Sequence, residues 1–189
     1  MDAPLLFPQL PLAARPPFYF ALRPDAVMAA RIRALARNFQ RREQIGGQLY
    51  PADRLHVSLC PIGLDGLRRG DMTAAMRAAT EIAVESFPLR FDTAASVRGR
   101  GGHCLILRSS AQSHRFLQLV DGLRHNLARA GLSVPGGAGD PHLTMIRQTA
   151  ETPEGRLATP IEWLAGEFVL ARLGGSAGDD LGRWPLNCR

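Results

Sequence analysis

The sequence predicts a mixed fold of strands and helices in which one strand–helix–strand unit occurs twice. The chain has 189 residues, 46% hydrophobic and 21% charged, which is an ordinary composition for a globular protein. A shift of 86 residues superposes the first unit on the second without a gap, with Phe18 on Cys104 and His56 on His142. The units, about 17–62 and 103–148, predict two halves related by a pseudo-twofold axis.

The first unit begins with an aromatic-rich segment, 18–22, which predicts a buried strand. A helix over 25–40 follows, because apolar residues recur there at helical spacing. The segment 55–60 predicts a second strand. Between the units, Asp71 is placed to cap a helix that runs to residue 85, and 89–95 predicts a strand.

The second unit repeats this order, with a strand over 103–108 and a strand over 142–147. Ser109 or Ser110 is expected to cap the helix between them, which ends at Gly131. The last strand of the unit follows a glycine-rich loop, 135–139. Beyond the unit we expect a polar loop over 151–160, a strand over 167–173 and a final strand over 182–186.

The repeated histidine strands carry the chemistry. Residues i and i+2 of a strand point to one face, so His56 lies beside Ser58, and His142 beside Thr144. Two halves that face each other would place both imidazoles and both hydroxyls around one cleft. Imidazole titrates near pH ~6.5, so one ring can act as base and the other as acid, while hydroxyls donate to phosphoryl oxygens. The set predicts cleavage of a phosphodiester, without assigning which histidine is the acid.

The paired H-x-[S/T]-x tetrads at 56–59 and 142–145 resemble the signature of the two-histidine (2H) phosphoesterase superfamily. They are most similar to its bacterial RNA 2′,3′-cyclic phosphodiesterases, also called 2′-5′ RNA ligases. The resemblance covers roughly 17–186. It implies an α+β fold of two pseudo-twofold-related lobes, each an antiparallel sheet with helices on its outer face, which form a V-shaped central cleft.

The same resemblance implies an activity. It implies hydrolysis of RNA 2′,3′-cyclic phosphate termini to a 2′-phosphate, with a weak, reversible 2′-5′ joining reaction. By this resemblance His56 is the proton donor and His142 the proton acceptor, while Ser58 and Thr144 hold the phosphoryl oxygens.

Two positions beside the tetrads affect substrate binding. Arg147 matches an arginine that often follows the second tetrad and is a candidate to bind substrate. Strict alternation places it on the face away from His142, so it reaches phosphate only if the strand bends there. Where family members often carry an aromatic residue after the first tetrad, this chain has Pro61. The change bears on substrate preference if that aromatic stacks on a base.

Composition excludes several other classes. All 23 basic residues are arginine, so no lysine Schiff base or P-loop lysine is present. Three cysteines without a CxxC pair favour neither disulfides nor zinc and fit a reducing cytoplasm. We expect no metal and no cofactor. No stretch approaches the ~18 apolar residues of a membrane span, so we expect no membrane partner. A monomeric domain over 17–189 is expected, with 1–16 as an N-terminal tail or arm.

The net charge of +6 suits a polyanionic partner such as RNA. Two alternatives to the RNA phosphodiesterase stay open. One is the same chemistry on a small cyclic nucleotide or a 2′-5′-linked oligonucleotide, which rates on mononucleotides and oligonucleotides would separate. The other is an RNA-end binding module without turnover, whose salt-dependent binding would survive loss of both histidines.

Overall fold

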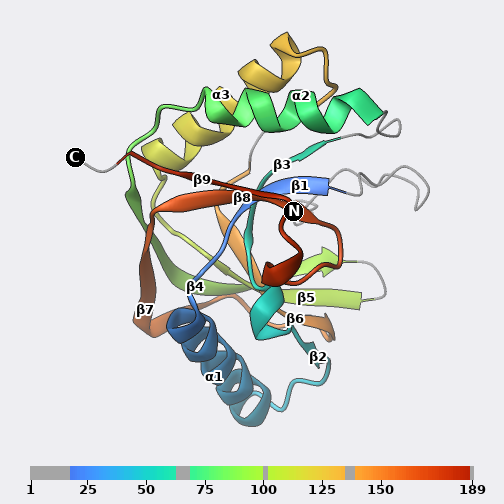
Figure 1. The fold of residues 1–189 in the computed structure, drawn as a ribbon. Helices are drawn as coiled ribbons and strands as arrows, with labels where there is room; N and C mark the ends of the chain where they lie inside the picture. The colour runs from blue at the N-terminus through green and yellow to red at the C-terminus, as the bar shows by residue number, and fades with distance from the viewer. Residues whose placement is uncertain (1–17, 63–68, 100–101, 135–138, 188–189) are drawn as a thin grey trace.

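A computed structural model describes residues 18–62, 69–99, 102–134 and 139–187 (Figure 1). Over these ranges the protein is α+β, with a large antiparallel sheet and three α-helices. The helices are α1 (Ala26–Arg42), α2 (Arg69–Thr80) and α3 (His114–Arg129), with short 3₁₀ turns η2 (Ala52–Arg54) and η3 (Ala177–Asp179). The strands are β1 (Phe18–Leu22), β2 (Gln48–Leu49), β3 (Val57–Ile62), β4 (Phe87–Gly99), β5 (Gly102–Arg108), β6 (His142–Thr149), β7 (Gly155–Ala165), β8 (Glu167–Arg172) and β9 (Gly182–Pro185).

The sheet is symmetric about its centre. Its order is β7-β4-β5-β6-β3-β1-β8-β9, so β6 and β3, the two histidine strands, are the central neighbours. They share a single paired position, Val57 with Leu143, and both side chains are fully buried. We call this junction the β3–β6 seam, and β2 of the first half also pairs with β6 of the second, through Gln48–Arg147 and Leu49–Ile146.

The strand pairing shows how the two halves correspond. Val57 pairs with Leu22 of β1, and Leu143 pairs with Leu107 of β5, an offset of 85 residues for the outer strands. The histidine strands keep an offset of 86, whereas the helix caps Asp25 and Ser113 differ by 88. The expected gap-free superposition is therefore wrong. Strand pairing fixes the register within each half, while the connecting loops absorb the extra residues.

Each histidine strand carries a one-residue irregularity at the same repeat position. The β1–β3 register skips Leu59, and the β5–β6 register skips Met145. Leu59 and Cys60 are both buried in the core, as are Met145 and Ile146. A bulge turns two successive side chains inward and returns the next residue to the original face. Residues 61 and 147 therefore come back to the face that carries the histidines.

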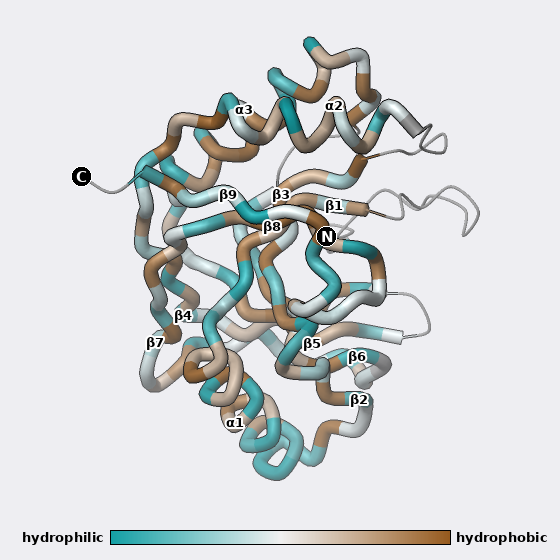
Figure 2. The backbone as a smooth tube through the Cα atoms, in the orientation of Figure 1, coloured by the Kyte–Doolittle hydropathy of each residue, from teal (hydrophilic) through white to brown (hydrophobic). Residues whose placement is uncertain are grey.

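The main core fills the space between the sheet and the helices (Figure 2). In α1 the predicted apolar stripe packs inward, with Ile32 fully buried. Two smaller clusters lie on the opposite, histidine-bearing face of the sheet. One belongs to β1 and β8 and the other to β4 and β5, in equivalent places of the two halves: Tyr19, Ala21, Val169 and Ala171, and Ala95, Val97, Ile106 and Cys104.

Two helix boundaries differ from the sequence prediction. Asp71 lies within the first turn of α2 rather than before it, and the helix ends at Thr80. The cap of α3 is Ser113, whose side chain accepts a hydrogen bond from the Phe116 backbone N–H. Ser110 is engaged elsewhere, because its hydroxyl donates to Asp92.

The segment expected as a polar loop over 151–160 is also corrected, since β7 begins at Gly155 and pairs with β4. It is the last strand on its side of the sheet, where exposed polar residues and a proline are tolerated. The expected tail over 1–16 and most of the loop over 135–139 lie outside the described residues. None of the described helices has the length and apolar character that a membrane span requires.

Candidate active site

Both motif histidines are held in the same way. The Nδ1 atom of His56 lies 2.7 Å from the backbone oxygen of Arg54, and that of His142 lies 3.0 Å from the backbone oxygen of Asp140. A carbonyl oxygen only accepts, so Nδ1 carries the hydrogen in both rings. The neutral rings are therefore Nδ1–H tautomers, and each Nε2 is left to take up or release a proton.

The seam brings the hydroxyls to the histidines. Val57 and Leu143 pair directly, so continuing this antiparallel register by one residue places His56 opposite Thr144 and Ser58 opposite His142. Each imidazole thus has its own hydroxyl two residues along the strand and the other motif's hydroxyl across the seam. In the described part of the chain neither hydroxyl makes a hydrogen bond, and both residues are half-buried.

Two tyrosine rings surround His56. The Tyr19 ring centroid is 4.8 Å from that of His56, and the Tyr50 centroid is 6.0 Å away. Tyr19 also pairs across β1–β3 with Pro61, the position where the family often has an aromatic residue. Tyr50 reaches the site because β2 pairs with β6 and the Tyr50 backbone N–H donates to Met145 O, at 2.8 Å. The site therefore has aromatic surface that the proline cannot supply.

Arg147 joins this group. Its guanidinium carbon lies 4.5 Å from the centre of the Tyr50 ring, and its Nη2 donates to the Tyr50 hydroxyl at 3.1 Å. Strict alternation would have turned the side chain away from His142. The one-residue irregularity at Met145 interrupts the alternation and returns Arg147 to the histidine face.

The environment keeps both imidazoles neutral. The pKa of His56 is lowered to about 4, chiefly by burial; the Arg54 carbonyl opposes this shift, and the charges of Arg23, Arg147 and His142 add to it. Burial also lowers the pKa of His142, with a contribution in the same direction from Arg108.

An arginine stands one strand out from each histidine. Arg108 pairs with His142 across β5–β6. Arg23 follows Leu22, the partner of Val57, so the same register places it opposite His56. The two arginines occupy equivalent positions of the two halves, although an ungapped shift of 86 residues fails to align them.

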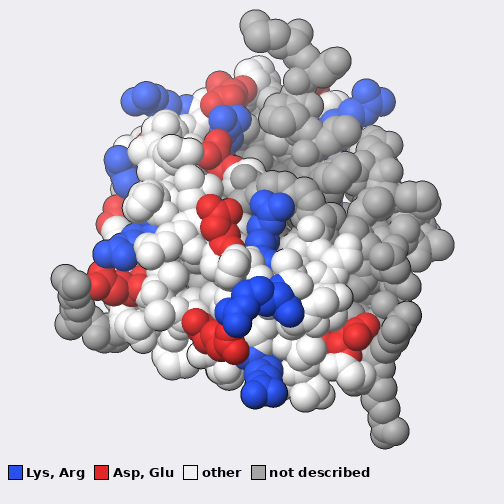
Figure 3. Space-filling model, turned by 90° about the horizontal axis from the view of Figure 1, so that it is seen from above, with Lys and Arg blue, Asp and Glu red and all other residues white. Residues whose placement is uncertain are grey.

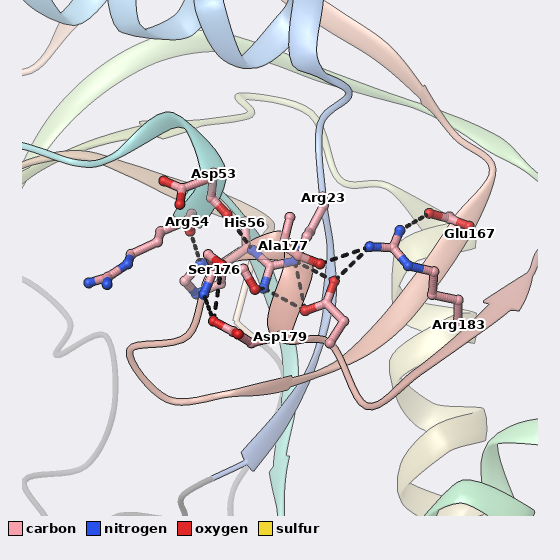
Figure 4. A network of polar contacts seen from close by, with 10 residues as sticks. Arg23, Asp53, Arg54, His56, Glu167, Ser176, Ala177, Asp179 and Arg183 are labelled. Atoms are coloured by element: carbon pink, nitrogen blue, oxygen red, sulfur yellow. Dashed lines mark hydrogen bonds and ion pairs between the residues drawn. The ribbon is translucent and has the colours of Figure 1, made fainter.

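Arg23 belongs to a buried polar network that reaches His56 (Figure 4). Its Nε and Nη2 donate to the Asp180 carboxylate at 2.7–3.1 Å, and the two side chains are 7% and 1% exposed. Nη1 donates to the Asp53 backbone oxygen at 3.3 Å, in the turn η2 that also presents the Arg54 carbonyl to His56. Arg183 donates to the same Asp180 carboxylate. The network ties η2 to the segment around η3.

The sequence singled out His56, Ser58, His142, Thr144 and Arg147, and the structure brings all five to the β3–β6 seam or its edge. The sequence prediction did not include Tyr19, Tyr50, Arg23 and Arg108, because their positions in the site depend on cross-strand register. Of these four residues, only Arg23 and Arg108 could be recognised as equivalent from the sequence, because an arginine stands at the end of the first strand of each unit. Within the described ranges no group of three or more His, Cys, Asp or Glu side chains could hold a metal ion.

The fold and the paired histidine motifs define a 2H phosphoesterase. The model of the 2′-5′ RNA ligase superfamily matches residues 24–176, and the chain belongs to that family. No individual curated protein gives a significant match.

Solved structures share the fold. E. coli LigT complexed with 3′-AMP superposes with a TM-score of 0.74 at 24% identity, over 92% of this chain and 99% of LigT. The protein TT0787 of Thermus thermophilus gives 0.65 at 18% identity, over 89% and 97% of the two chains. The MHV ns2 PDE domain gives 0.53 at 16% identity, over 80% and 98%.

Proposed function

We propose that this protein hydrolyses RNA 2′,3′-cyclic phosphate termini to 2′-phosphates by metal-independent acid–base catalysis. The observation that carries the proposal is the matched pair of imidazoles at the β3–β6 seam. Each is anchored through Nδ1 to the carbonyl two residues earlier, and each has a motif hydroxyl opposite it. Such a set provides one proton acceptor, one proton donor and two phosphoryl ligands.

The reaction follows from these groups. Water attacks the phosphorus while His142 Nε2 takes its proton, the P–O3′ bond breaks, and His56 Nε2 gives a proton to the departing O3′. Ser58 and Thr144 donate to the non-bridging oxygens as charge develops there. The donor and acceptor roles follow the family resemblance. Because burial keeps both rings neutral near pH 7, the donor takes up its proton as the anionic substrate binds.

The rest of the site fits a nucleotide. Arg147 supplies a positive charge for phosphate, and the half-buried Tyr50 ring offers apolar surface beside His56. A structural neighbour, E. coli LigT, has been crystallised with 3′-AMP, with ATP and with NADP+, which supports a nucleotide ligand for this fold. The joining reaction, where present, would be the reverse transesterification.

The test uses an oligonucleotide that ends in a 2′,3′-cyclic phosphate, with EDTA present throughout. We expect hydrolysis by the wild-type protein and a loss of about 10²–10⁴ in kcat for His56→Ala and for His142→Ala. His125→Ala is the matched control, because His125 is exposed on α3. Activity in EDTA that neither motif variant reduces would refute the mechanism.

The alternatives give different outcomes in the same assay. Equal or faster turnover of 2′,3′-cyclic mononucleotides would assign a small cyclic nucleotide as substrate. RNA binding without turnover, unaffected by loss of both histidines, would indicate a binding module. The face above α2 and α3 gives no support to binding by charge alone, because arginine and acidic side chains lie interspersed there (Figure 3). On α3, Arg115 pairs with Glu85 and Arg129 pairs with Glu81.

A further inference from the structure

The two equivalent arginines beside the histidines have different surroundings. Arg23 has its guanidinium enclosed by Asp180, the Asp53 carbonyl and the Ser176 carbonyl, and its side chain is 7% exposed. Its donors are thereby committed within the protein. Arg23 therefore links η2 to the segment around η3, and four of its five N–H groups are engaged there.

The side chain of Arg108 is more exposed than that of Arg23. Its side chain is 37% exposed, and its carboxylate partner, Glu154, is 57% exposed with an N–O distance of 3.7 Å. That separation is too long for a hydrogen bond, and an exposed pair of this kind contributes little to stability. The guanidinium can therefore exchange Glu154 for another anion at little cost.

The position of Arg108 directs it to the site. Residues paired directly across antiparallel strands project to the same face with Cβ atoms about 4.5–5.5 Å apart. Arg108 is the direct partner of His142, so both side chains rise from the histidine face of the sheet. The charge of Arg108 acts on His142, as expected of neighbours.

We propose that Arg108 is a substrate-binding residue whose guanidinium contacts the non-bridging oxygens of the phosphoryl group held between the two histidines. This inference rests on the proposed function and adds a residue to it. A guanidinium presents two parallel N–H donors that match two phosphoryl oxygens. In the free protein Glu154 lies beside that position, and the substrate phosphate replaces it. Of the two equivalent arginines, Arg108 thus binds the ligand and Arg23 stabilises the fold.

The experiment measures binding of inorganic phosphate by calorimetry in wild type and three variants. Arg108→Met removes the cation, Glu154→Gln removes the competing carboxylate, and Arg90→Met is the matched control. Arg90 is likewise a strand arginine beside an exposed glutamate, Glu162 at 4.0 Å, but on β4. We expect phosphate affinity to fall about tenfold or more in Arg108→Met, to rise in Glu154→Gln, and to stay unchanged in Arg90→Met.

Opposite signs for the first two variants are the decisive result. A pair that only stabilises the fold would make Arg108→Met and Glu154→Gln change affinity in the same direction, and that outcome, or unchanged affinity in Arg108→Met, overturns the inference. Thermal melting of each variant shows that it is folded. The binding readout needs no turnover, so it tests Arg108 even if the protein does not hydrolyse cyclic phosphates. With active protein, Arg108→Met should raise KM on mononucleotide and oligonucleotide alike.

Discussion

The half-buried His56 ring makes the stability of this protein sensitive to acid. Its pKa is about 4 in the folded chain and near ~6.5 when unfolded. As the pH falls through 6.5, His56 becomes protonated in the unfolded chain but stays neutral in the folded chain. The free energy of unfolding therefore falls between pH 6.5 and 4, and this contribution levels off below pH 4. From pH 7 to pH 5 the loss is about 2 kcal/mol, an upper value because the ring keeps some contact with solvent.

His56→Gln tests this. Glutamine has no charge to gain, so the variant should lose about 2 kcal/mol less stability than wild type between pH 7 and pH 5. The measurement is urea unfolding at pH 5, 6 and 7, followed by tryptophan fluorescence. His142, whose pKa burial also lowers, adds an acid-dependent loss in both proteins, so the difference between them measures the contribution of His56 together with its effect on His142.

The matched control is His125→Gln, since His125 is exposed on α3 and should leave the pH dependence as in wild type. Absolute stabilities at pH 7 are free to differ among the variants, because only the change with pH is compared. Equal losses in wild type and His56→Gln between pH 7 and pH 5 would contradict the depressed pKa of His56.

Three further results are expected. Because the pKa values of both motif histidines lie below 6.5, kcat/KM should be maximal on the acid side of pH 6.5 and fall about tenfold per unit above it; a plateau up to pH 8 would exclude this pair as acid and base. Arg23→Met leaves the Asp180 carboxylate buried without its main partner and should cost about 3–5 kcal/mol in urea unfolding, part of which Asp180→Asn restores; additive losses would contradict the coupling. Tyr50→Leu removes the ring and hydroxyl that hold Arg147, and a roughly threefold to tenfold rise in KM is expected from steady-state kinetics, with a smaller effect for Tyr50→Phe; unchanged KM in Tyr50→Leu would exclude the contact from substrate binding.

The parts of the fold that repeat could be predicted from the sequence. The histidine strands, the two long helices of the repeat and the strand over 167–173 follow from periodicity and from the recurrence of His56 at His142. The prediction of a loop over 151–160 failed because an edge strand is exposed to water on its open side. As a result, β7 shows no apolar alternation through Pro160. The prediction of the α3 cap failed because three serines precede the helix. The hydrogen bond from Ser110 to Asp92, which engages Ser110 elsewhere, is a tertiary contact.

The site was predicted only as far as residues near in sequence define it. Alternation along one strand gives His56 with Ser58, but it cannot place Arg147, because the irregularity at Met145 reverses the alternation. Tyr50 and Arg108 are close to the histidines only through strand pairing. An ungapped comparison of the repeats also hides the equivalence of Arg23 and Arg108, since one residue has been gained between the first strand and the histidine.

The one paired position that the two histidine strands share has a consequence for how this protein tolerates change. Val57 and Leu143 are apolar residues with no chemistry of their own, yet each lies between the imidazole and the hydroxyl of its own motif. Because interiors are close-packed, we expect a methylene added or removed there to disturb the contact between the two histidine strands. Substitutions at this position therefore act on the placement of both motifs as well as on the stability of the core.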